Sequence, residues 1–87
     1  MRILVVEDEH KIAQSLKKGL EQESFAVDLA FSGDTGLDLG LTNDYDVIIL
    51  DPMLPVKSGI EICQQLRVNN IHTPILILTA KDQLILS

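Results

Sequence analysis

Uninterrupted apolar runs and alternating positions define the strands that this sequence predicts. The runs cover residues 3–6, 47–50 and 75–78, and each is rich in Ile, Leu or Val. Such runs are typical of strands that are buried on both faces, as in a parallel sheet. From Phe25 to Phe31, apolar side chains instead occupy every second position, which predicts a half-exposed edge strand.

A repeat of three to four residues predicts helices between these strands. Ile12, Leu16 and Leu20 recur among polar residues and indicate an amphipathic helix. Two further helices are expected at about 33–42 and 58–68. The resulting order, β-α-β-α-β-α-β, predicts an α/β fold with an open, doubly wound parallel sheet. In such a sheet, ligand chemistry belongs at the carboxyl ends of the strands.

Composition narrows the classes of function. Hydrophobic residues make up 46% of the 87 residues, which is enough for one packed domain. The formal charge of −6 argues against direct binding of nucleic acid or of an anionic membrane. No apolar run approaches the length of a membrane span, and the single cysteine, Cys63, is expected to be a small thiol on a helix face. We therefore expect a cytoplasmic protein.

Polar residues follow each of the three apolar runs. Glu7 and Asp8 follow the first, Asp51 the second and Thr79 the third. Two carboxylates about 4 Å apart repel each other by roughly 4 kcal/mol at an effective dielectric constant near 20. Either a proton or a cation must reduce that repulsion, and an all-oxygen ligand set favours Mg²⁺. Asp51 could then act as a nucleophile toward a phosphoryl donor, with the Thr79 hydroxyl contacting a phosphoryl oxygen.

Residues 3–9, residues 47–55 with Gly59, and residues 75–81 together resemble the receiver domain of response regulators, most closely the OmpR/PhoB type. The resemblance implies a flavodoxin-like fold and a sensor histidine kinase that phosphorylates Asp51. It also implies Mg²⁺ held by Glu7, Asp8, Asp51 and the backbone carbonyl of Met53, with Thr79 as the switch residue.

Departures from the family pattern qualify this expectation. Receiver domains have five βα units, so residues 1–87 are expected to form a single truncated receiver without the last two helices, the lysine-bearing fifth strand or a DNA-binding domain. Lys81 is expected to be a surface residue, and so are His10 and His72. Pro52 removes a backbone N–H beside the phosphorylation site, which predicts slow phosphorylation.

The first functional hypothesis is a phosphoacceptor signalling module of a transcription regulator, which turns over no external metabolite and is not an enzyme in the usual sense. The alternative is a receiver remnant that no longer signals and instead self-associates. A phosphatase of the haloacid dehalogenase type would need a second acid at position 53, where Met53 stands. A dinucleotide site would need a Gly-rich turn in place of residues 7–9.

Assembly follows from the expected truncation. Without a fifth strand, residues 75–78 would form an apolar sheet edge, and such edges pair with other chains. The apolar tail at 83–87 could fold back on its own chain as a replacement strand, or be donated to a partner. We therefore expect a homodimer joined near the fourth strand and the C-terminal segment.

Overall fold

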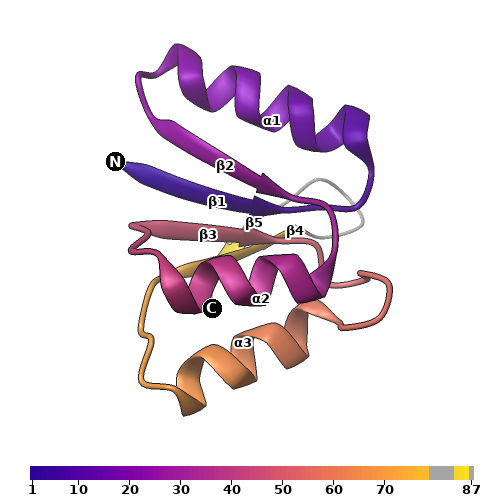
Figure 1. Cartoon of the computed structure of the whole chain (residues 1–87). Coiled ribbons are helices and arrows are strands. Elements are labelled where there is room, and N and C mark those ends of the chain that lie inside the picture. The colour runs from indigo at the N-terminus through magenta and orange to yellow at the C-terminus, as the bar shows by residue number, and fades with distance from the viewer. Residues whose placement is uncertain (79–83, 87) are drawn as a thin grey trace.

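The computed structural model describes residues 1–78 and 84–86, which form five strands and three helices (Figure 1). In chain order these are β1 (Arg2–Val6), α1 (His10–Gln22), β2 (Ala26–Ala30), α2 (Gly33–Thr42), β3 (Val47–Leu50), α3 (Gly59–Val68), β4 (Ile75–Leu78) and β5 (Leu84–Leu86). The predicted order of elements is confirmed as far as β4. The expected helices at 33–42 and 58–68 agree with α2 and α3 to within a residue.

The strands form one sheet in the order β2-β1-β3-β4-β5. The first four strands are parallel, whereas β5 runs antiparallel to β4. One helix, α1, covers one face of the sheet, while α2 and α3 cover the other (Figure 1). The doubly wound α/β arrangement is therefore confirmed, and the carboxyl ends of the four parallel strands meet at one edge of the molecule.

Two apolar clusters, one on each face of the sheet, hold the fold together. The cluster on the side of α2 and α3 contains Leu4, Val6, Ala30, Leu37, Tyr45, Ile48, Leu50, Leu54, Ile62, Leu66 and Ile75. The cluster on the side of α1 contains Ile3, Val5, Val27 and Ile49. Alternate residues of β1 and β3 thus enter opposite clusters, which explains why these two runs are apolar without interruption.

Side-chain caps and left-handed residues set several helix boundaries. Ser32 accepts a hydrogen bond from the Thr35 N–H at the start of α2, and Ser58 does the same for Glu61 at the start of α3. These bonds satisfy N–H groups that a helix leaves unpaired in its first turn. Asn70, with φ of 62°, follows α3 in the left-handed conformation that asparagine tolerates.

The apolar stripe of α1 differs in one position from the predicted one. Ala13 is buried and Leu16 and Leu20 pack against the sheet, but Ile12 is 42% exposed. At 100° per residue, Ile12 lies about 80° around the helix from Leu20, so that it falls at the border of the stripe.

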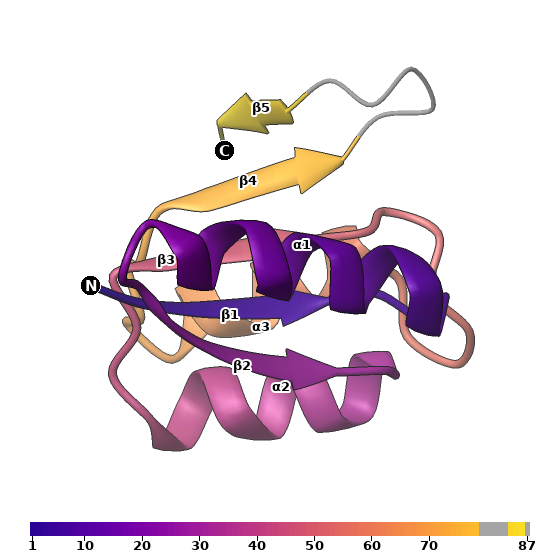
Figure 2. The ribbon, with the colours of Figure 1, turned by 90° about the horizontal axis from the view of Figure 1, so that it is seen from above.

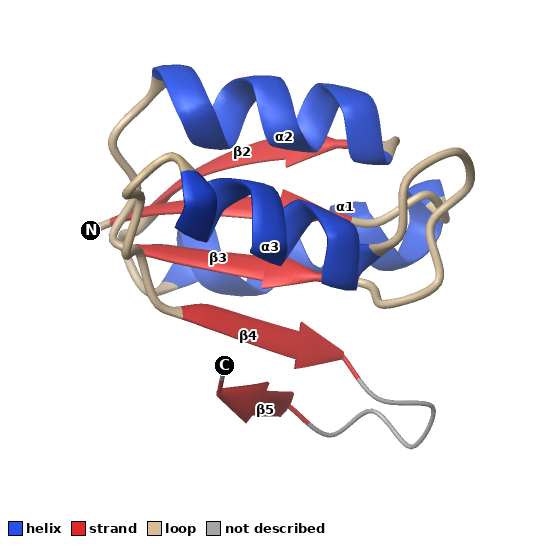
Figure 3. Ribbon diagram, turned by 90° about the horizontal axis from the view of Figure 1, so that it is seen from below, coloured by secondary structure: helices blue, strands red, loops and turns tan. Residues whose placement is uncertain are grey.

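The C-terminal segment replaces β4 as the edge of the sheet. The expectation that the fourth strand forms the edge is wrong, because β5 folds back and pairs with it, Ile77 opposite Ile85. Of the two possibilities open for the tail, the structure shows fold-back on its own chain for residues 84–86. Views from the two faces show that β4 and β5 extend beyond all three helices (Figures 2 and 3).

Candidate functional site

Three acidic side chains meet where β1 and β3 end. These strands are parallel neighbours, with Val6 opposite Leu50, and the Asp51 N–H donates to the Val6 carbonyl at 2.9 Å. The ladder therefore carries Glu7 and Asp51 to adjacent positions, with Asp8 next along the chain. Ligand oxygens of the three carboxylates all lie within 4.8 Å of one another. The predicted convergence of these three residues is borne out by the fold.

The burial of Glu7 distinguishes it from the other two acids. Its side chain is buried, with the whole residue 4% exposed, whereas Asp51 is half-buried and Asp8 is exposed. Desolvation, followed by the hydrogen-bonded Asp51 carboxylate, raises the pKa of Glu7 from 4.5 to about 7. A hydrogen bond from the Glu9 N–H to Glu7 Oε2, at 3.2 Å, partly opposes this rise. The cluster consequently favours a proton or a cation among its oxygens at neutral pH.

The turn after β3 fixes the orientation of Asp51. Pro52 has no N–H to offer, but the Met53 N–H donates to Asp51 Oδ1 at 3.0 Å. Behind this turn, Gly59 donates its N–H to the Pro52 carbonyl at 3.2 Å. A Cβ atom on Gly59 would lie 2.7 Å from the Asp51 carbonyl oxygen, so only glycine fits here without displacing the backbone of the site.

The rest of this loop contains a strained residue that the sequence pattern did not reveal. Val56 has φ of 70°, a region that β-branched residues rarely adopt, and is 84% exposed. The Lys57 N–H donates to the Pro55 carbonyl at 2.8 Å across it, closing a three-residue turn. The loop is also packed closely against α2, because a Cβ on Gly33 would overlap the Lys57 carbonyl oxygen.

The structure describes some of the remaining predicted residues and not others. Thr79 and Lys81 lie outside the described residues, so the switch role predicted for Thr79 stays a prediction. His10 and His72 are both exposed, as expected. However, His10 stacks on Phe31 with ring centroids 3.9 Å apart and an angle of 9° between the rings. No spacing rule indicated that contact, because it joins the start of α1 to the residue that follows β2.

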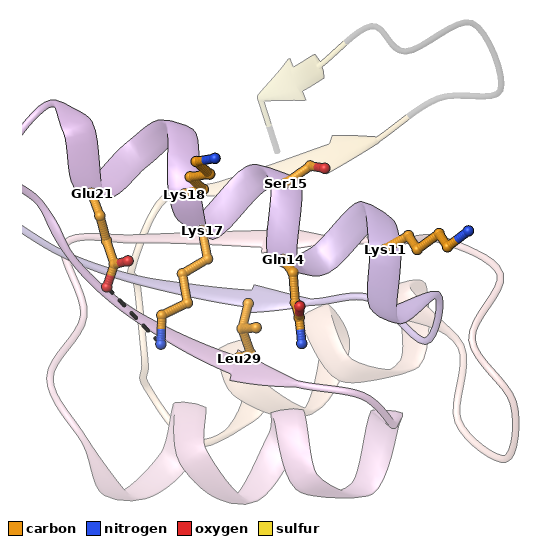
Figure 4. A pocket seen from close by; sticks show the side chains of 7 residues that line it. All are labelled: Lys11, Gln14, Ser15, Lys17, Lys18, Glu21 and Leu29. Atoms are coloured by element: carbon orange, nitrogen blue, oxygen red, sulfur yellow. Dashed lines mark ion pairs between the residues drawn. The ribbon is translucent and has the colours of Figure 1, made fainter.

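A second polar surface lies along α1 (Figure 4). It is a shallow groove lined by Lys11, Gln14, Ser15, Lys17, Lys18, Glu21 and Leu29. Lys17 and Glu21 form an ion pair at 4.0 Å, one helical turn apart. Exposed pairs of this kind contribute little stability, and the groove brings no nucleophile or metal-ligating cluster together. Among the described residues, no helix has the length and apolarity needed to cross a membrane.

Comparison with known proteins identifies a family. Residues 3–86 match the response regulator receiver domain. The transcriptional regulatory protein DltR of Streptococcus agalactiae is 48% identical over 83 residues, a match that covers 95% of this chain and 37% of DltR. CusR of Escherichia coli, also a transcriptional regulatory protein, is 51% identical over 80 residues, 92% of this chain and 35% of CusR. The chain thus spans little more than a third of the length of these relatives.

Solved structures agree with these relatives. The receiver domain of Francisella response regulator 1452 superposes with a TM-score of 0.88 at 43% identity, covering 94% of this chain and 68% of that one. The response regulator TrrA of Thermotoga maritima, solved in complex with Mg(2+)-BeF, gives a TM-score of 0.83 at 34% identity. That match covers 92% of this chain and 71% of TrrA.

Proposed function

Because the chain belongs to the response regulator receiver domains, which are signalling domains and not enzymes of metabolism, we propose that it is a phosphoacceptor module whose acceptor is Asp51. The donor would be a sensor histidine kinase, and the parent protein would be a transcription regulator of the kind that DltR and CusR represent. One observation carries the proposal: the oxygens of Glu7, Asp8 and Asp51 lie within 4.8 Å of one another at the carboxyl ends of β1 and β3.

Mg²⁺ fits this set of ligands. The donors are all carboxylate oxygens, which suit a small hard cation that also keeps several waters. Glu7, Asp8 and Asp51 would hold the ion, together with the backbone carbonyl of Met53. When bound, it would offset the negative charge that builds up as a phosphoryl group approaches a carboxylate. The raised pKa of Glu7 supports this fit, since burial and then the hydrogen-bonded Asp51 carboxylate disfavour a charged form that a bound cation would stabilise.

The chain's own part in the transfer is positioning. The Met53 N–H holds Asp51 Oδ1, which limits rotation of the carboxylate. An Asp51 oxygen would form the new bond to phosphorus while the P–N bond to the donor histidine breaks and its electron pair leaves with the imidazole. Thr79 would contact a phosphoryl oxygen of the product. Pro52 would make the transfer slow, because an N–H at that position could have contacted the phosphoryl group.

Incubation with acetyl phosphate and Mg²⁺, followed by intact mass and peptide mapping, tests this function. We expect one phosphoryl group on Asp51 in the parent and none in Asp51→Asn. Asp44→Asn removes an equal charge from an exposed position outside the acidic cluster, and should be modified like the parent. Modification of His10 or His72, or modification that persists without a divalent cation, would contradict the proposal.

Calorimetric titration with Mg²⁺ alone tests the metal site separately from phosphorylation. Asp51→Asn should bind Mg²⁺ at least tenfold more weakly than the parent, because one of three anionic ligands is lost. Asp44→Asn should bind it like the parent. Equal affinity in all three proteins would exclude the acidic cluster as the site.

A second candidate function is self-association by a chain that does not signal. The observation in its favour is the ribbon of β4 and β5, which extends beyond the helices on both faces (Figures 2 and 3). A protein that assembles but never acquires a phosphoryl group at Asp51 would support this candidate over the first.

A further inference from the structure

At β4 the sheet is less covered than at its centre. In β1 and β3, all described side chains but those of Arg2 and Val47 are buried, whereas Leu76, Ile77 and Leu78 of β4 are only half-buried. β5 is bonded to β4 on one side only, so the backbone groups of its other side face outward. Unpaired N–H and C=O groups along a sheet edge are a template for pairing with another strand. The β5 edge is therefore available for pairing with a further strand.

The two edges of the sheet differ in how they discourage pairing. β2 carries Asp28 at its centre, where the carboxylate accepts hydrogen bonds from Arg2 and from the Tyr45 hydroxyl. A charge in the middle of an edge strand is a common block against further pairing. The sequence of β5 is Leu-Ile-Leu, without a charge or a proline. Of the two edge strands, β5 therefore lacks the central charge that discourages pairing at β2.

We propose that the β5 edge binds the β5 edge of a second copy of this chain, antiparallel, about a two-fold axis perpendicular to the sheet. When a strand pairs antiparallel with its own copy about such an axis, the residue at the axis lies opposite the same residue of the partner. An axis at Ile85 pairs all three residues of β5, with Leu84 opposite Leu86 of the partner. The two five-stranded sheets then form one continuous sheet, and each copy supplies the same short apolar edge that the other requires.

The choice of a second copy follows from length and symmetry. β5 has three residues, so a longer foreign strand could use only three of its own positions. The β5 strand of a second copy has the same length, so every residue of each β5 strand has a partner in the other. Dimerisation through β5 does not depend on phosphorylation of Asp51, so a failure of one proposal would leave the other standing.

Cysteine cross-linking tests this geometry directly. In a Cys63→Ala background, single substitutions Ile85→Cys, Leu84→Cys and Leu86→Cys are compared under a mild oxidant. Residues opposite each other in an antiparallel pair have Cα atoms about 4.5–5.5 Å apart, within reach of a disulfide. Residue 84 and its symmetry mate would be two positions out of register and beyond about 7 Å. Cross-linking of Ile85→Cys should therefore be at least tenfold faster than that of either neighbour.

The parent protein supplies the control for a different interface. Its single cysteine, Cys63, lies on α3 in an apolar groove with Ile60, Val68 and Ile77. If copies associated through that groove, the parent would cross-link through Cys63. Rapid cross-linking of the parent, or equal rates at positions 84, 85 and 86, would overturn the β5 pairing.

Sedimentation equilibrium gives a second measurement that needs no cysteine. The parent should approach twice its 9.6 kDa mass as its concentration rises. Ile85→Lys places a charge at the centre of the edge and should weaken dimerisation at least tenfold. Gln22→Lys, at an exposed position of α1, makes the same change in net charge and should dimerise like the parent. A parent that stays monomeric, or equal weakening in both variants, would also overturn the proposal.

Discussion

Among the residues that the structure describes, Glu7 is the one whose ionisation the fold alters most clearly. Its pKa is raised from 4.5 to about 7, so between these values the folded chain keeps a proton that the unfolded chain releases. The free energy of unfolding therefore falls as pH rises through this window. Without divalent cations at pH 8, Glu7→Gln should be more stable than the parent by about 1–2 kcal/mol, and the two should be alike at pH 4.

Urea denaturation at the two pH values checks this prediction for Glu7→Gln. Adding Mg²⁺ at pH 8 should stabilise the parent and have less effect on the variant, which lacks one carboxylate ligand. If the variant is equally or less stable than the parent at pH 8 without Mg²⁺, the ionised and buried Glu7 carboxylate does not destabilise the folded chain.

Val56 supports a second prediction at the scale of a single residue. A valine at φ of 70° is strained by roughly 1–3 kcal/mol, and glycine would relieve that strain at some entropic cost. Val56→Gly should therefore raise the free energy of unfolding by about 1 kcal/mol. Asn70→Gly is the matched control, because asparagine tolerates its φ of 62° and should gain much less. Equal gains in both variants would show that Val56 carries no special strain.

The sequence predicts the position of a residue well where that residue follows directly from a strand. It predicts poorly the contacts between residues that are far apart in the sequence. Glu7 and Asp51 could be assigned to one cluster because parallel strands end at the same edge. The His10–Phe31 stack and the turn at Val56 could not be foreseen, since each depends on how a loop packs against a distant element. The sequence pattern places Ile12 in the apolar stripe, but Ile12 is 42% exposed because a four-residue spacing drifts around a helix of 3.6 residues per turn.

At the scale of elements, the start of α3 and the end of β3 share one tightly packed junction. A methyl group on Gly59 would meet the Asp51 carbonyl oxygen at 2.7 Å, so the backbone must shift. Gly59→Ala should lower the free energy of unfolding by about 1–3 kcal/mol and weaken Mg²⁺ binding, because Asp51 moves with its backbone.

The matched control for this junction is Gly19→Ala. Gly19 lies within α1, where an added Cβ meets nothing within 4 Å. Alanine is the better helix former, so this variant should gain about 0.5–1 kcal/mol. Thermal denaturation of the two variants separates the effects, and a neutral Gly59→Ala would mean that the junction can relax without cost.

Seven of the eight elements could be predicted from local patterns. Apolar runs identify β1, β3 and β4, alternation identifies β2, and polar stretches with an apolar stripe identify the helices. For the eighth, β5, the sequence allows two pairings, since a short apolar tail satisfies the same hydrogen bonds on its own chain or on a partner. The pairing of β5 with β4 of its own chain is a property of the three-dimensional arrangement, which local patterns of apolar residues do not encode.

For the whole molecule, net charge should control assembly. Two copies with a formal charge of −6 repel each other, and the proposed edge pairing must overcome that repulsion. Salt screens the repulsion, with a Debye length that falls from about 30 Å at 0.01 M to about 3 Å at 1 M. Raising NaCl from 0.05 to 0.5 M should therefore tighten dimerisation by roughly three- to tenfold. Sedimentation equilibrium across this range measures the change.

A general effect of salt on apolar surfaces would also tighten the dimer, so the measurement needs a variant of different charge. Gln22→Lys lowers the formal charge from −6 to −5 without altering the β5 edge. Its affinity should depend less steeply on salt than that of the parent, because there is less repulsion to screen. Identical slopes would attribute the effect to apolar surface alone. A dimer that weakens as salt is added would instead indicate an interface built on ion pairs. The proposed pairing of two uncharged β5 strands contains none, so this result would contradict it.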